Sequence, residues 1–145
     1  MIFCESIISQ NFSFDTKNLT VGQSHATWSI IFSSDGKLLK ESNSKATLDS
    51  IRKFLEQNPT IKVEIGSHTN KDHDLETDLI YSKKCATSIK DYLFRHGIDS
   101  TRLSIKGYGH MKPYLTGEQE IKRKEQCYPL QFPSNERTVI TILKI

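Results

Sequence analysis

The sequence predicts a two-layer α/β sandwich, in which two main helices cover one face of a mixed sheet. Apolar residues alternate with polar ones in several short segments, as in strands, and recur at helical spacing in two longer segments. The two kinds of segment alternate along the chain and give the order βαβαββ. A chain of 145 residues is long enough for one self-sufficient domain of this kind.

The first half of the pattern consists of a strand and a helix. Residues 27–33 are rich in β-branched and aromatic side chains, which predicts a buried strand. Apolar residues then recur at helical spacing, from Leu48 to Leu55, and predict a helix over residues 44–57. This helix should end just before Pro59, since proline disfavours helical dihedrals in the residue that precedes it.

A second strand and a long helix follow. Apolar and charged residues alternate over residues 61–65, which predicts a strand that ends at Gly66. A polar loop over residues 67–74 leads into a helix that extends to about His96, and Gly97 is a typical residue for its C-terminal end.

Two further strands complete the predicted sheet. One contains Leu103 and Ile105 and is closed by the sequence Gly107–Gly109. The last covers residues 139–143, and because it is apolar on both faces we expect it in a central position. Between them lies a loop over residues 110–134, long enough to suggest a functional segment.

The domain is expected to cover residues 27–145, and residues 1–26 form an N-terminal extension with a possible edge strand at Ser9–Phe14. The net charge of +3 comes from basic residues scattered among 17 acids, so no nucleic-acid partner is predicted. No apolar run is long enough to span a membrane. A signal peptide is not evident, which leaves both an exported fragment and a cytosolic protein open.

Neither a disulfide framework nor a structural zinc site is indicated. Cys4, Cys85 and Cys127 form no C-x-x-C pair. Cys85 lies on the apolar stripe of the long helix and is expected to be buried. Cys127 lies in the long loop and is expected to be free, although pairing with Cys4 or with another chain is open.

Catalytic residues and cofactors are not predicted. His68 and His73 lie in one loop beside acidic residues, but their spacing has no characteristic metal geometry and a third ligand is not obvious. Ser82 lacks the G-x-S-x-G context of a hydrolase nucleophile. We therefore expect a non-enzymatic protein without a metal or cofactor.

An ordered set of short motifs resembles the C-terminal domain of the OmpA family, the peptidoglycan-associated module of Gram-negative envelopes. The family pattern runs G-H-T-D, N-x-x-L-S-x-x-R-A, G-I, R-L, G-x-G, P and N-R-R-V. The corresponding segments here are Ser67–Asn70, Asp78–Ala86, Gly97–Ile98, Arg102–Leu103, Gly107–Gly109, Pro113 and Asn135–Thr138. The resemblance extends over roughly residues 27–145.

This resemblance implies a non-enzymatic envelope module that binds the peptide stem of peptidoglycan noncovalently, chiefly through diaminopimelate. It also implies a location at the periplasmic face of the outer membrane. The partners are expected to be peptidoglycan or envelope proteins, and the chain is expected to be a monomer or a weak dimer. The free end of diaminopimelate carries an amine and a carboxylate on one carbon, so its recognition requires an anion and a cation at fixed separation.

The resemblance places candidate ligand-binding positions at Ser33, Thr69, Asn70, Asp78, Cys85, Asn135 and Arg137. The family pattern has aspartate at position 70 and arginine at position 85, and this chain has uncharged residues at both. It also has Glu136 in place of an arginine, and the acid expected at the first strand exit falls on Ser33 or on Asp35. Loss of such a charged contact typically costs ~2–5 kcal/mol of binding free energy.

Two interpretations follow from these departures. In the first, peptidoglycan binding is weakened or retuned, with Asp78 as the replacement anion and Arg137 or Lys84 as the replacement cation. In the second, the fold is kept, and the domain serves as a protein–protein interaction or structural module without peptidoglycan binding.

Overall fold

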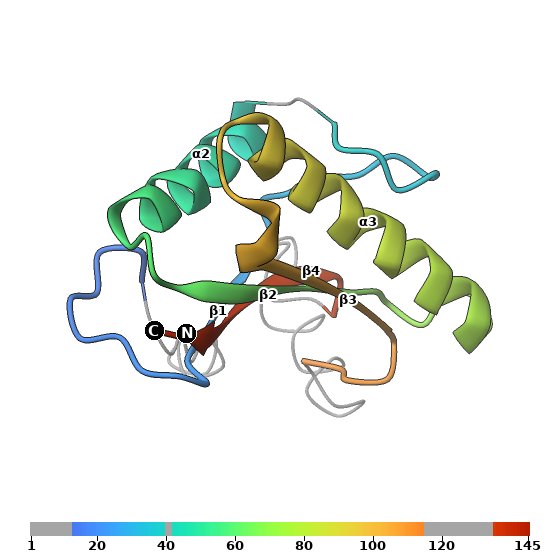
Figure 1. The fold of residues 1–145 in the computed structure, drawn as a ribbon. Helices are drawn as coiled ribbons and strands as arrows, with labels where there is room; N and C mark the ends of the chain where they lie inside the picture. Colours follow the sequence, from blue (N-terminus) through green and yellow to red (C-terminus); the bar gives the residue numbers. More distant parts are fainter. Residues whose placement is uncertain (1–12, 40–41, 115–134) are drawn as a thin grey trace, which may run out of the picture.

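The computed structural model describes residues 13–39, 42–114 and 135–145, and these form a mixed sheet covered on one face by two helices (Figure 1). The two helices cross the same side of the sheet, so the described part of the chain has two layers. The predicted α/β sandwich is therefore confirmed.

The described strands form one four-stranded sheet in the order β1–β4–β2–β3. Their bounds are Ser24–Thr27 for β1, Lys62–His68 for β2, Leu103–Gly109 for β3 and Arg137–Lys144 for β4. β4 pairs antiparallel with both β1 and β2, whereas β2 and β3 are parallel. The central position predicted for the last strand is confirmed, and its Ile140 and Ile142 are fully buried.

The strand predicted over residues 27–33 is wrong in its position, because the observed β1 ends at Thr27. The residues that follow bond to the first helix instead of to a strand. The Ile31 N–H donates to the Ser44 hydroxyl oxygen at 2.9 Å, and that hydroxyl donates to the Ser29 carbonyl at 3.1 Å. The run is apolar because it packs into the core, and composition alone does not distinguish that role from strand pairing.

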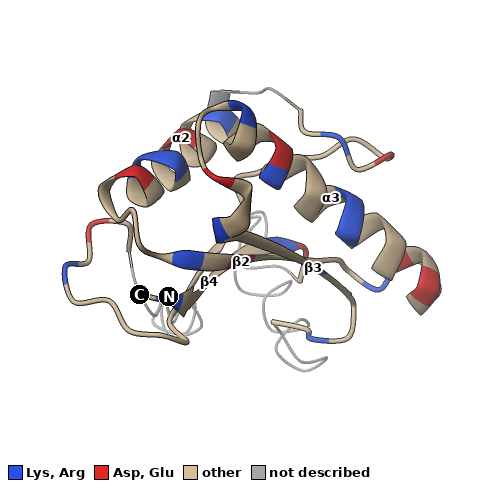
Figure 2. Cartoon of the chain, viewed as in Figure 1, with Lys and Arg blue, Asp and Glu red and all other residues tan. Residues whose placement is uncertain are grey.

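Both predicted helices are confirmed, as α2 (Ser42–Gln57) and α3 (Leu75–Arg95). Asp74 caps α3, since its carboxylate accepts the Thr77 N–H at 3.0 Å. Acidic residues in the first turn and Arg95 in the last match the helix dipole. Figure 2 shows the acidic end of α3 at the edge of the molecule, beyond the sheet.

One core holds the two layers together, and its fully buried members come from α2, β2, α3 and β4. They include Ile51, Phe54, Leu55, Val63, Ile65, Ile89, Leu93, Ile140 and Ile142. Burial of each such side chain contributes roughly 1.5–3 kcal/mol.

α3 approaches β3 very closely at Gly107. A Cβ atom on Gly107 would lie only 2.5 Å from the Lys83 backbone nitrogen and 2.7 Å from the Ser82 hydroxyl oxygen. That hydroxyl accepts the Gly109 N–H at 2.9 Å and so bonds the helix to the strand. The Gly-x-Gly sequence therefore sets the depth at which α3 packs.

Arg102 connects the end of α2 to the start of β3. It lies in the short 3₁₀ helix η1 (Ser100–Arg102), and its guanidinium donates to three backbone carbonyls. These acceptors are Ile61 at 2.9 Å, Leu55 at 2.8 Å and Asn58 at 2.7 Å.

Several predictions lie wholly or partly outside the described residues. They concern Cys4, Cys127, the first part of the possible strand at Ser9–Phe14 and the loop beyond residue 114. The described end of that strand, Ser13–Phe14, lies in a turn closed by a bond from the Thr16 N–H to the Ser13 carbonyl. Within the described ranges, neither helix combines the length and the apolar character needed to cross a membrane.

Candidate functional site

Two adjoining cavities open where β2 ends and α3 begins. The first has a volume of about 470 Å³ and is lined by Thr69, Asp72, Asp78, Lys84 and other residues of the β2–α3 loop and α3. The second, of about 390 Å³, lies between residues 28–32, the end of β2 and α3. Tyr81 and Glu136 line both cavities and so mark their junction.

The predicted site residues divide into two groups. Thr69 and Asp78 line the first cavity, and Cys85 and Arg137 line the second. The other three, Ser33, Asn70 and Asn135, are not among the lining residues of either cavity.

Asp78 is buried and already has partners within the protein. Its side chain is only 3% exposed, and the Nδ1 atom of His110 lies 2.6 Å from Oδ2. The Nδ1 atom of His73 lies 3.4 Å from Oδ1 on the other side. The carboxylate therefore ties the β3 exit to the first turn of α3, and its role as the replacement anion stays a prediction.

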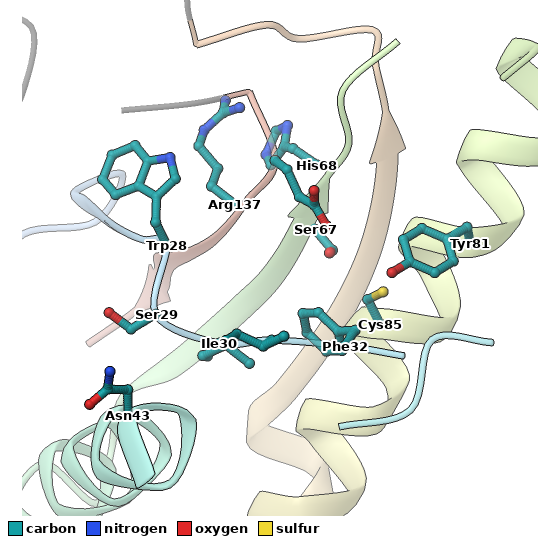
Figure 3. A pocket seen from close by; sticks show the side chains of 12 residues that line it. Trp28, Ser29, Ile30, Phe32, Asn43, Ser67, His68, Tyr81, Cys85 and Arg137 are labelled. Carbon is teal, nitrogen blue, oxygen red and sulfur yellow. The ribbon is translucent and has the colours of Figure 1, made fainter. Parts of the chain in front are cut away.

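Cys85 is the buried, uncharged residue that the sequence predicts, at the position where the family pattern has arginine. It is 1% exposed and unpaired, and burial raises the pKa of its thiol to about 11. The thiol also contacts the Tyr81 hydroxyl and Ser67. The wall of the second cavity formed by α3 is therefore neutral at physiological pH (Figure 3).

Ser33 is engaged within its own turn. Its hydroxyl donates to the Asp35 carboxylate, and the Lys37 ammonium lies 2.8 Å from the same acid. The bonds from Lys37 and Ser33 hold the pKa of Asp35 well below its usual range. Only the Ser33 carbonyl reaches toward the cavities, where it accepts the Tyr81 hydroxyl at 3.2 Å.

Arg137 supplies the positive charge of the second cavity. Its Nη1 donates to the Asn135 carbonyl at 2.8 Å and its Nη2 to the Lys112 carbonyl at 3.1 Å. The guanidinium lies 5.2 Å from the centre of the Tyr114 ring. Burial lowers the pKa of Arg137 to about 10, so it remains charged at neutral pH.

His68 lies beside Arg137 and is uncharged. Burial, and secondly the charge of Arg137, lowers the pKa of His68 to about 3. Its ring stacks on Tyr108, with the centroids 4.6 Å apart and the planes within 6°. Figure 3 shows His68, Arg137 and Trp28 together on the side of the cavity opposite α3.

Glu136 is the feature that sequence reasoning undervalued, since it noted this residue only as a lost arginine. The structure places Glu136 at the junction of the two cavities. Burial, and secondly the nearby charge of Asp72, raises the pKa of its carboxyl group. Tyr81 also lies at this junction, where its hydroxyl donates to the Ser33 carbonyl.

The comparisons with known proteins agree with this geometry. The family model described as "OmpA family" matches residues 31–126, which is more than half of the chain. The chain belongs to the OmpA family. This membership makes it a non-enzymatic structural module, as the sequence predicts.

The similar curated proteins are peptidoglycan-associated lipoproteins. Those of Haemophilus influenzae and Pasteurella multocida are each 29% identical to this chain over 73 residues, which cover 50% of it. The match covers 48% and 49% of the two lipoproteins, so the chain spans about half the length of the relatives it matches.

The similar solved structures have the same fold at low sequence identity. An outer membrane protein from Borrelia burgdorferi has a TM-score of 0.60 and 24% identity, covering 88% of this chain and 95% of that one. The peptidoglycan-associated lipoprotein from Burkholderia pseudomallei has a TM-score of 0.61 and 17% sequence identity, and the match covers 78% of this chain and 86% of that one. The periplasmic domain of Helicobacter pylori MotB (residues 78–256) has a TM-score of 0.64 and 14% sequence identity, and the match covers 88% of this chain and 79% of that one. At these identities the likeness establishes the fold alone.

Proposed function

We propose that this OmpA-family chain binds peptidoglycan noncovalently, through the stem peptide, at the two adjoining cavities, with a retuned set of contacts. The main support is that Thr69, Asp78, Cys85 and Arg137, four of the positions implied by the resemblance, line adjoining cavities. The printed names of the relatives, peptidoglycan-associated lipoproteins, support the ligand class. A place at the periplasmic face of the outer membrane is part of this proposal.

Co-sedimentation with purified sacculi tests the proposal. Sacculi with diaminopimelate stems and sacculi with lysine stems are both used, so that the result does not depend on the third residue of the stem. We expect retention on at least one type, and a loss of about tenfold or more in the double variant Asn70→Ala, Arg137→Ala. Lys53→Ala, an exposed change on α2, is the control and should leave retention unchanged.

A second candidate function, protein–protein interaction without peptidoglycan, is favoured by the uncharged pair Asn70 and Cys85. If neither type of sacculus retains the wild-type chain more than the double variant, this second function replaces the first. Circular dichroism of both proteins confirms that the comparison is between folded chains.

A further inference from the structure

An open groove lies at the other end of α3 from the two cavities. Its volume is about 780 Å³, and it is bounded by residues 37–39, the first turns of α2 and the last turns of α3 (Figure 1). Its apolar and aromatic lining consists of Leu38, Leu39, Leu48 and Tyr92. Leu39 is 37% exposed. The groove therefore presents apolar surface at a place that the proposed peptidoglycan site does not use.

Two hydrogen bonds from α3 hold the walls of the groove in place. The Ser88 hydroxyl donates to the Gly36 carbonyl at 2.7 Å, which fixes the chain just before residues 37–39. The Tyr92 hydroxyl donates to the Asp49 carboxylate at 3.1 Å and so joins α3 to α2. Because these bonds form the groove before a partner arrives, binding there costs less entropy than binding to a mobile surface.

The charged side chains of the groove leave it with an excess of positive charge. Lys45 on α2 and Arg95 on α3 are exposed, and neither forms an ion pair with another described residue. Lys37 also lines the groove, but its ammonium lies 2.8 Å from the Asp35 carboxylate. Asp91 is the only acid among the described lining residues. The charge that remains for a partner is therefore positive.

An apolar groove with cations at its rim is complementary to an acidic amphipathic helix. Such a helix places apolar side chains one turn apart in the groove, while its carboxylates face the cations. A second copy of this chain fits less well, because a two-fold dimer through this face would bring Lys45 and Arg95 close to the same cations of the partner. The concave shape also suits a helix better than the surface of a bilayer.

We propose that this groove binds an acidic amphipathic helix of another protein. The apolar side chains of that helix would contact Leu38, Leu39 and Tyr92, and its carboxylates would lie beside Lys45 and Arg95. The inference goes beyond the proposed function, since the groove and the two cavities use different turns of α3. A chain with both activities would connect peptidoglycan to a protein partner.

Three synthetic peptides of about 15 residues, titrated into the whole chain, test the inference. The first has leucine on one helical face and glutamate elsewhere, the second has lysine in place of glutamate, and the third has serine in place of leucine. We expect the first to bind at least about tenfold more tightly than the others in calorimetry, with an affinity that falls as salt is added. Its amide shifts in NMR should cluster at residues 37–39 and 88–96.

Variants of the chain assign this binding to the groove. Lys45→Glu with Arg95→Glu should weaken the acidic peptide about tenfold or more, and so should Leu39→Ser, an exposed change. The matched control is Lys53→Glu with Lys83→Glu, the same change of charge at exposed positions of the same two helices outside the groove. It should alter the affinity by no more than about twofold. Circular dichroism of each variant verifies the fold.

Several outcomes would overturn the inference. They are no binding of the acidic peptide, equal binding of the basic one, or an equal loss of affinity in the control variant. Binding to phosphatidylglycerol vesicles without peptide binding would make the groove a membrane surface. A dimer in analytical ultracentrifugation that Leu39→Ser abolishes, again without peptide binding, would make it an interface between copies. Retention on sacculi is measured separately, so the proposed function stands or falls independently of these results.

Discussion

At the scale of single residues, three replacements change what the family site can recognise. Cys85 and Asn70 remove the charges that would pair with a zwitterion, and Glu136 introduces an acid at the junction of the cavities. Asp78, the predicted replacement anion, lies against His110 and His73, and its part in binding stays a prediction.

Restoring the family charges is expected to restore diaminopimelate binding. In the double variant Asn70→Asp, Cys85→Arg, the new arginine can extend from α3 into the second cavity, which has room for its side chain. The affinity for the diaminopimelate tripeptide should rise about tenfold or more, as titration calorimetry would measure.

The control for this variant is Asn70→Asp, Cys85→Met, which fills the same space without charge and should give no such gain. If the arginine variant folds by circular dichroism and gains no affinity, then the loop itself has diverged. The loop between β2 and α3 would then be the first segment to examine.

Sequence reasoning identified the residue types of the site but not their partners. The loss of charge at Cys85 and Asn70 follows from alignment with the family motifs alone. The pairing of Asp78 with His110 does not, because it joins two segments 32 residues apart and depends on how α3 packs against the β3 exit. The place of Glu136 between two cavities likewise follows from tertiary structure rather than from local pattern.

At the scale of secondary structure, the elements with strong periodicity were predicted well. The apolar repeats of α2 and α3 and the alternation in β2 and β4 each come from one buried face, so the sequence carries the signal directly. The first strand was misplaced because residues 28–33 leave the sheet after Thr27: within this run only Ile30 is buried, and Phe32 forms an isolated antiparallel bridge with Leu38. The Ser44 side chain satisfies their backbone groups in place of a neighbouring strand.

The close contact of α3 with β3 predicts a large effect of a single methyl group. Gly107→Ala would place its Cβ within 3 Å of the Lys83 nitrogen, so α3 or β3 must shift. We expect the free energy of unfolding to fall by roughly 1–3 kcal/mol, as measured by urea denaturation. The matched control is Ser104→Ala, an exposed change on the same strand, with an expected effect within about 0.5 kcal/mol. A Gly107→Ala protein as stable as the wild type would mean that the helix is not held at this depth.

At the scale of the whole molecule, a neutral histidine at the end of the inner strand β2 makes stability depend on pH. The folded chain holds the pKa of His68 at about 3, whereas in the unfolded chain it has the ordinary value of 6.5. Between these values the unfolded state binds the proton and the folded state does not. The contribution of His68 is therefore fully favourable above pH 6.5 and is lost progressively as the pH falls toward 3.

This linkage is measurable as the slope of the free energy of unfolding against pH. The free energy of unfolding should fall by up to ~1.4 kcal/mol for each pH unit below 6.5 from His68 alone, in urea titrations from pH 7 to pH 4. His68→Gln removes the titrating group and should flatten the slope, whatever its effect on stability at pH 7. Ser104→Ala, an exposed change on β3 that removes no titrating group, should leave the slope as it is. A slope that is the same in His68→Gln and wild type would assign the acid sensitivity to other groups.

The two outer strands of the sheet also affect how the chain behaves at high concentration. β1 has only four residues, and β3 carries the exposed Lys106 and ends beside an irregular step in its pairing with β2. Short length, lysine and irregular register each make a strand a poor template for the backbone of another molecule. Edge-to-edge growth into β-aggregates is therefore disfavoured on both sides of the described sheet.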